Sequence, residues 1–282
     1  QNQLGSGFHV NLVISTQYVK CLRGPCPPVM RYTVVVEDAK VYAQAPTTGL
    51  QSMSYRISAD GKIIDSTVSA TYYSANGNLK VDGTLLYQGL LQITSDPVYL
   101  MATGIHIRKV DENGAIYFEH KNYVWKVTRD ETGAVKLEQG LPVPVQDLVD
   151  QLTAEMPGYS VLVKPYYDRR PIYCKTGDCG RPGVLYYSVS IIYSGAEGLE
   201  TGDLSSMRLQ VSAKGEILQV MSAEYNGIGK VDAALLFGAL MKLQIGCTAD
   251  AKVCITVMPN PVQAIIDMGH IQITESQPTF IR

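Results

Sequence analysis

The sequence of 282 residues has no apolar run of about 18 residues, so it contains no segment long enough to cross a membrane as a helix. It is also poor in charge. Charged residues make up 18%, and 24 Lys and Arg nearly balance 26 Asp and Glu, for a net charge of −2. A nucleic-acid-binding protein needs a basic excess to neutralise phosphates. We therefore expect neither a membrane span nor a nucleic-acid partner.

Short motifs of the common enzyme classes are also missing. There is no G-x-S-x-G elbow, no G-x-x-x-x-G-K-[ST] phosphate loop and no G-x-G-x-x-G dinucleotide loop. None of the 4 histidines has a second histidine at metal-ligand spacing. Asp111-Glu112 and Asp130-Glu131 come nearest to paired carboxylates, but Asp is common in turns for backbone reasons. We expect a protein that is not an enzyme and holds no cofactor and no metal.

The 6 cysteines form three local pairs with spacings C-x4-C, C-x4-C and C-x6-C: Cys21 with Cys26, Cys174 with Cys179, and Cys247 with Cys254. An even count in tight pairs indicates short-loop disulfides formed in an oxidising compartment. Zinc binding is one alternative, although four-thiolate sites usually contain C-x2-C, which is absent. Free thiols are the other alternative.

Other features point to an extracellular or cell-surface protein. The chain begins at Gln1, which either a removed signal peptide or an internal start would explain. It has 18 Tyr against 4 Phe, and Tyr supplies apolar area while its hydroxyl stays hydrated. Intracellular proteins of hyperthermophiles also carry disulfides, so that origin stays open. With either origin we expect a thermostable protein.

Several motifs recur in the same order, which indicates an internal duplication. The pairs are Leu50-Gln-Ser-Met53 with Leu204-Ser-Ser-Met207, Ala59-Asp-Gly61 with Ala213-Lys-Gly215, Ser69-Ala-Thr-Tyr72 with Ser222-Ala-Glu-Tyr225, Lys80-Val-Asp82 with Lys230-Val-Asp232, and Pro142-Val-Pro-Val-Gln146 with Pro259-Asn-Pro-Val-Gln263. The spacing of the last pair is shorter, which predicts an insertion in the first copy at about 106–141. We expect a first domain at 1–155 and a second at 156–282.

Each copy carries the same expected elements. Alternation at Phe8, Val10, Leu12 and Ile14 predicts a half-buried strand, and residues 159–163 repeat the pattern. Further strands are expected at 32–36 and 185–189, with hairpins that turn at the glycines 61 and 215. Helices are expected at about 80–92 and 230–244, each followed by a strand pair. The P-x-P-V-Q motif then opens a last short helix.

The insertion predicts a β-meander with strands at 106–110, 115–120 and 123–128. Gly89 and Gly238 lie inside the two expected helices, where glycine is unfavourable, which predicts a close backbone approach to the sheet. The expected fold is therefore α+β and β-rich: a tandem duplication of a twisted antiparallel sheet with one main covering helix per copy.

The two copies share apolar residues, glycines, prolines, cysteines and tyrosines rather than titratable pairs. This favours a secreted, disulfide-stapled, non-enzymatic cell-surface structural protein. Its expected role is that of a filament subunit, which would self-associate by β-strand donation. Phe8, Val10, Leu12 and Ile14 form the candidate donor strand. Pairing of that strand within its own domain is the alternative.

A monomeric extracellular binding or inhibitory module is the second hypothesis. Tyrosine suits such contacts because it gives a large, rigid and amphipathic contact area. Tyr166, Tyr167, Arg169 and Arg170 form the candidate binding surface, and a solvated loop is the alternative interpretation of these residues.

Overall fold

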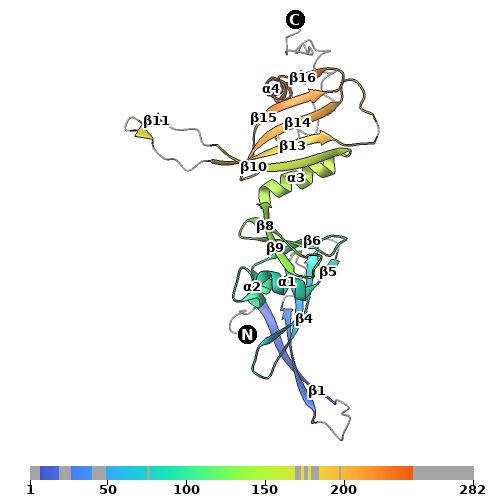
Figure 1. Ribbon diagram of the computed structural model, residues 1–282, viewed down its shortest axis with the longest axis vertical. Coiled ribbons are helices and arrows are strands. Elements are labelled where there is room, and N and C mark those ends of the chain that lie inside the picture. The colour runs from blue at the N-terminus through green and yellow to red at the C-terminus, as the bar shows by residue number, and fades with distance from the viewer. Residues whose placement is uncertain are drawn as a thin grey trace. The chain divides into compact units, whose positions relative to one another are not determined.

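A computed structural model describes residues 7–18, 27–39, 49–74, 77–168, 173–174, 177–178, 184–196 and 198–243 (Figure 1). The chain divides into two compact units, Gln1–Leu141 and Pro142–Arg282. Both consist mainly of antiparallel strands with short helices, which confirms the β-rich α+β class. Helix α3 (Val143–Glu155), which lies within the expected first domain, is part of the second compact unit.

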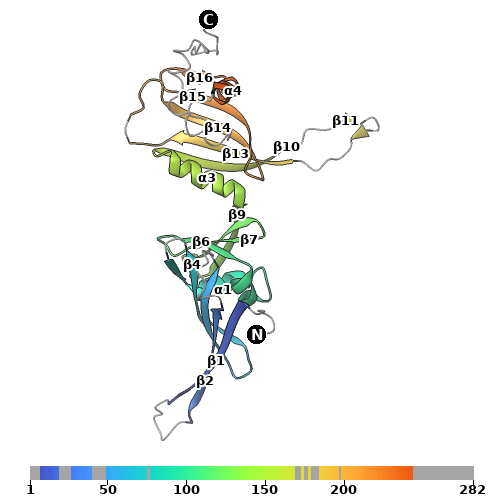
Figure 2. The ribbon, with the colours of Figure 1, turned by 180° about the vertical axis from the view of Figure 1, so that it is seen from behind.

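The first unit contains a sheet of 5 strands in chain order: β1 (Phe8–Gln17), β2 (Val29–Asp38), β3 (Leu50–Ile57), β4 (Ile63–Ser74) and β5 (Gly77–Val81). The turn between β3 and β4 contains Gly61 at φ 80°, the conformation predicted for it. β1 pairs with β2 along its whole length, whereas β3 pairs with β2 only from Tyr32 to Glu37. The hairpin of β1 and β2 therefore projects beyond the third strand, as Figures 1 and 2 show.

Two helices follow this sheet. Helix α1 (Gly83–Leu90) confirms the helix predicted at 80–92 and packs on β4. It begins where the carboxylate of Asp82 accepts a hydrogen bond from the Leu85 N–H at 2.9 Å. Helix α2 (Pro97–Thr103) comes next, so the predicted strand pair is wrong in this unit. Asp96 caps α2 and Pro97 occupies its first turn, and these two signals start a helix.

The insertion forms a separate sheet of 4 strands in the order β6 (His106–Val110), β7 (Ile116–His120), β8 (Tyr123–Arg129) and β9 (Val135–Pro142). The three predicted strands are confirmed, and β9 adds one. Two of the turns are held by Asp111 and Asp130, which accept hydrogen bonds from backbone N–H groups two and four residues further along at 2.9–3.0 Å. These carboxylates therefore stabilise turns.

The core of the first unit combines side chains from both sheets and both helices. Its largest fully buried members include Tyr72, Leu86 and Phe118. A Cβ at Gly89 in α1 would collide with the side chain of Val127 in β8, which confirms the close approach predicted there.

The second unit contains another sheet of 5 strands, in the order β10 (Tyr159–Asp168), β13 (Val184–Tyr193), β14 (Leu204–Ser212), β15 (Ile217–Tyr225) and β16 (Gly229–Val231). A short hairpin of β11 (Tyr173–Cys174) and β12 (Gly177–Asp178) lies between β10 and β13 in the chain. Helix α4 (Ala233–Leu243) packs on β15 and confirms the helix predicted at 230–244. No described atom lies within 4 Å of a Cβ built at Gly238, so the close approach predicted there is wrong.

Helix α3 covers the apolar face of the second sheet. Its Val145, Leu148 and Leu152 are 0% exposed, and the helix packs on β10 (Figure 1). At its start, the Pro144 carbonyl oxygen would lie 2.5 Å from a Cβ on Gly215, in the turn between β14 and β15. The P-x-P-V-Q motif at 142–146 therefore opens a helix, as predicted.

Candidate functional site: an exposed apolar arm

The most unusual surface of the described residues is the projecting end of the β1–β2 hairpin. We call residues 12–17 and 29–34 the arm, of which residues 15–17 and 29–31 lie beyond the end of β3. Five of its apolar side chains are about half exposed: Leu12 55%, Val13 50%, Ile14 55%, Val29 49% and Met30 47%. Leu12, Ile14 and Met30 lie on one face of the hairpin, and Val13 and Val29 lie on the other. Single exposed apolar residues are ordinary, but a group of them on one face is typical of an interaction surface.

One strand pattern produces both the buried and the exposed part of β1. Phe8 and Val10 pack against the core next to the fully buried Val36. Leu12 and Ile14 continue the same alternation and lie opposite Val34 and Tyr32 of β2, which still pair with Tyr55 and Ile57 of β3. Their side chains point to the same face as the core, yet they are about half exposed.

The backbone of β1 is accessible as well. β1 is the edge strand of its sheet, so its outer N–H and C=O groups have no strand partner among the described residues. Natural edge strands are usually protected by charges, prolines or bulges, because an open edge is a template for another strand. The segment Phe8–Gln17 contains no Lys, Arg, Asp, Glu or Pro and pairs with β2 without a bulge.

The edge strand of the second sheet differs on this point. β10 carries Lys164 and Pro165 in its middle and Asp168 at its end. Proline cannot donate to a ladder, and charges oppose pairing with a foreign strand. The second sheet therefore has a protected edge, and the first has an open one.

The candidate donor strand lies within β1, which the structure pairs with β2 of the same chain. Phe8 and Val10 anchor the strand to its own core, so the pairing within the domain is the one observed. Donation to a neighbour remains a prediction, and it would require this pairing to be broken. Val13, Val29 and Met30 were not among the candidate residues, although the absence of charge in 8–17 could have indicated Val13.

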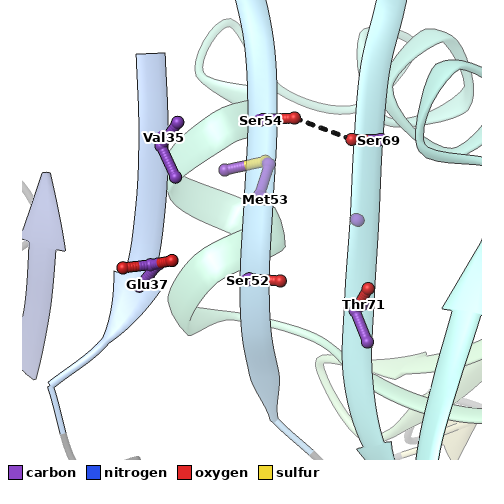
Figure 3. A pocket seen from close by; sticks show the side chains of 8 residues that line it. Val35, Glu37, Ser52, Met53, Ser54, Ser69 and Thr71 are labelled. Carbon is purple, nitrogen blue, oxygen red and sulfur yellow. Dashed lines mark hydrogen bonds between the residues drawn. The ribbon is translucent and has the colours of Figure 1, made fainter. Parts of the chain in front are cut away.

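A shallow hollow lies on the other face of the first sheet (Figure 3). Ser54 and Ser69 face each other there and share a hydrogen bond of 2.8 Å across β3 and β4. Glu37 is the single ionisable residue in the lining. One carboxylate and a set of hydroxyls do not form an acid–base pair, so the hollow offers no catalytic arrangement.

The candidate tyrosine surface is partly described. Tyr166 lies opposite Tyr186 on β13 with ring centroids 5.7 Å apart, and Tyr167 is 63% exposed. Arg169 and Arg170 lie outside the described residues. The structure therefore places an aromatic pair and an exposed ring at the end of β10.

Of the predicted disulfide cysteines, the described residues include only Cys174, which pairs with Gly177 between β11 and β12. The described part of the chain contains no free cysteine. Cys21, Cys26, Cys179, Cys247 and Cys254 lie outside it. The three disulfides therefore stay predictions.

Ionisable groups in the described residues serve the fold. Burial raises the pKa of Tyr72 and of Tyr225, so both phenols are neutral. The pKa of Asp111 is lowered, mainly by the backbone N–H of Ala115, and that of Asp130 mainly by the Thr132 hydroxyl. Within the described ranges, no group of His, Cys, Asp and Glu is arranged to hold a metal ion. No helix there is long and apolar enough to span a membrane.

Comparisons with known proteins return no match to any protein-family model, any curated protein or any solved structure.

Proposed function

We propose that this protein is a secreted, non-enzymatic structural subunit that self-associates through β-strands into an extracellular filament. The observation that carries the proposal is the edge of β1, which is 10 residues long, uncharged and flanked by the exposed apolar side chains of the arm. Such an edge favours addition of a strand from a second molecule, in which backbone hydrogen bonds give affinity and side chains give specificity.

The contrast between the two edge strands supports this interpretation. If exposure of β1 were incidental, the protections present in β10 would be expected in β1 too. Exposed apolar residues occur on both edge strands, but on β10 they accompany Lys164 and Pro165, whereas on β1 they accompany an edge without charge or proline. Repetition of one contact that does not close into a ring would produce a filament.

The proposal also includes a tandem duplication, which gives each subunit two similar modules. Both sheets have five strands in chain order, followed by a helix capped by an aspartate, Asp82 or Asp232. Tyr72 and Tyr225, which occupy matched motif positions, are 0% and 1% exposed. Three short-loop disulfides would suit a long-lived extracellular polymer.

Negative-stain electron microscopy and sedimentation of the native, non-reduced protein test this function. We expect filaments from the unaltered chain. The double variant Leu12→Lys, Ile14→Lys should remain monomeric, because it charges the arm without touching the core. Leu162→Lys is the matched control, since Leu162 is 52% exposed on the protected edge strand β10. Monomers from the unaltered chain at every concentration would refute the filament proposal.

A monomeric binding module is the second candidate, and the aromatic group on β10 favours it. Tyr166 and Tyr186 form a ring pair on one face at the end of β10, and the exposed Tyr167 lies on the opposite face. Such exposed rings suit a planar or sugar-like ligand. The same sedimentation experiment separates the candidates, because only this one expects a monomer. Quenching of tyrosine fluorescence on titration with glycans would then support it, provided that Tyr167→Ala reduces the signal.

A further inference from the structure

The two sheets differ in what covers one end of their apolar faces. In the second sheet, Leu209 and Val211 on β14 are 0% exposed, and so is Val189 on β13, which pairs with Leu209. The residues at the matching positions of the first sheet are Tyr55, Ile57 and Val34, and all three are only half-buried. The same part of the repeat is therefore sealed in one unit and accessible in the other.

The start of helix α3 lies at this end of the second sheet. In the second unit the Pro144 carbonyl at the start of α3 leaves no room for a Cβ on Gly215. Gly61 holds the matching position in the turn between β3 and β4, and no described atom lies within 4 Å of a Cβ built there. The first sheet thus lacks, among its described neighbours, the helix start that the second sheet has. We call Val34, Tyr55, Ile57 and Gly61 the uncovered face.

The chain carries a second copy of the motif that opens α3. Pro259-Asn-Pro-Val-Gln263 matches Pro142-Val-Pro-Val-Gln146. In α3, the two buried residues of the first turns are Val145 and Leu148, and the segment has Val262 and Ile265 at those positions. The third buried residue, Leu152, corresponds to Gly269, so the match covers the first two turns of the helix. Residues 259–267 lie outside the described part of the chain.

We propose that residues 259–267 of one copy of the chain dock on the uncovered face of a second copy. This inference rests on the proposed function, and it names the segment that joins successive subunits. The order of elements along the chain indicates which unit such a segment docks on. α3 ends the first repeat yet packs on the unit that follows it in the chain. In a filament of such subunits, the first unit of another copy offers a sheet of the same kind.

The chemistry of the two surfaces agrees with this assignment. The uncovered face is apolar, apart from the phenol of Tyr55, whose pKa is raised by partial burial and by the nearby Asp96. The side chains of Val262 and Ile265 would add apolar area there, at roughly 25 cal/mol per Å² buried. Pro261 would approach Gly61 as Pro144 approaches Gly215, and glycine at both positions leaves the space that this requires.

Photo-cross-linking of the full chain tests the docking directly. The cross-linker p-benzoylphenylalanine replaces Ile266, which matches the half-buried Val149 of α3. Unlabelled and ¹⁵N-labelled chains are mixed before assembly, irradiated and digested. We expect links from the segment to residues 55–63, with mixed light–heavy pairs among them. Links only within one isotope would mean that the segment docks on its own chain, and links to other regions would place it elsewhere. Either result overturns the inference.

A variant pair gives an independent measure. Val262→Asp with Ile265→Asp should raise the concentration at half-assembly by about 10- to 100-fold, because two apolar contacts are replaced by charges. Ala264→Asp is the control, since α3 has the exposed Asp147 at that position. Circular dichroism must show that the variants are folded. Assembly lost in the arm variant but unchanged in the segment variant would refute this inference alone, whereas a monomeric unaltered chain would refute the proposed function.

Discussion

The hydroxyl of Tyr72 donates a hydrogen bond to the backbone carbonyl of Met101 at 3.0 Å, which joins β4 to helix α2 inside the core. Tyr72→Phe would leave that carbonyl without its donor in a site that is 0% exposed at the ring. We expect a loss of about 1–2 kcal/mol in the free energy of unfolding, measured by urea titration. Tyr73→Phe on the other face of β4 is the control and should change stability by less than about 0.5 kcal/mol.

Replacement of glycine by alanine should change the stability in opposite directions in helices α1 and α4. Gly89→Ala places a methyl group against Val127, so we expect destabilisation by about 1–3 kcal/mol. Gly238→Ala meets no described atom within 4 Å and should stabilise its helix by up to about 1 kcal/mol. Thermal unfolding of both variants measures the difference, and equal effects would contradict the packing of α1 on β8.

The helix caps predict a second matched pair. Asp82 and Asp232 each accept a hydrogen bond from the N–H three residues further along, at 2.9 and 3.0 Å. Asp82→Ala and Asp232→Ala should each lower the free energy of unfolding by about 1 kcal/mol. Asparagine at the same positions keeps the accepting oxygen, and so Asp82→Asn should retain most of the stability. A loss as large in the Asn variant as in the Ala variant would show that charge rather than capping is responsible.

Acid should weaken the turns of the insertion. The folded protein lowers the pKa of Asp111 and Asp130 below the ordinary value of 3.8. The stability that these two carboxylates give to the fold is therefore complete above pH 3.8. It is lost as the pH falls through their lower pKa values in the folded state. The double variant Asp111→Asn, Asp130→Asn should show a flatter decline of the melting temperature between pH 5 and about 2. Parallel curves for variant and unaltered chain would contradict this assignment.

Two fragments test where the second domain begins. Residues 142–282 include α3, and residues 156–282 do not. Removing α3 withdraws three fully buried side chains, each worth about 1.5–3 kcal/mol, which together approach the whole stability of a small domain. We expect the longer fragment to give a cooperative unfolding transition and the shorter one to give none. Equal transitions would support a boundary after residue 155.

Sequence patterns predicted where strands and helices lie better than they predicted what those elements pack against. Alternation at Phe8–Ile14 and the glycines at 61 and 215 located strands and turns, because strand periodicity and positive φ are local properties. Helix α2 was missed because its apolar residues, Val98 to Met101, also suit a strand, and its cap at Asp96 decided the outcome. β9 was missed because its alternation at Val135 and Leu137 gives way to polar residues and Gly140.

The candidate site depended on information that no local pattern contains. Phe8, Val10, Leu12 and Ile14 form one uniform alternation, yet two are packed and two are exposed, because exposure depends on which tertiary neighbours cover each end of that face. The sequence repeat likewise assigned α3 to the first domain by order alone. Which sheet a helix covers is decided by packing of Val145 and Leu148, and this appears only in three dimensions.

The interior described above is almost free of groups that gain or lose charge. Among the described residues, Gln210 is the single polar residue counted as buried, and the deeply buried phenols of Tyr72 and Tyr225 have pKa values raised by burial. Between mild acid and mild alkali, the described part of the chain changes its charge at the surface. The attraction or repulsion between neighbouring molecules can therefore be adjusted by the surrounding medium while each molecule keeps its shape.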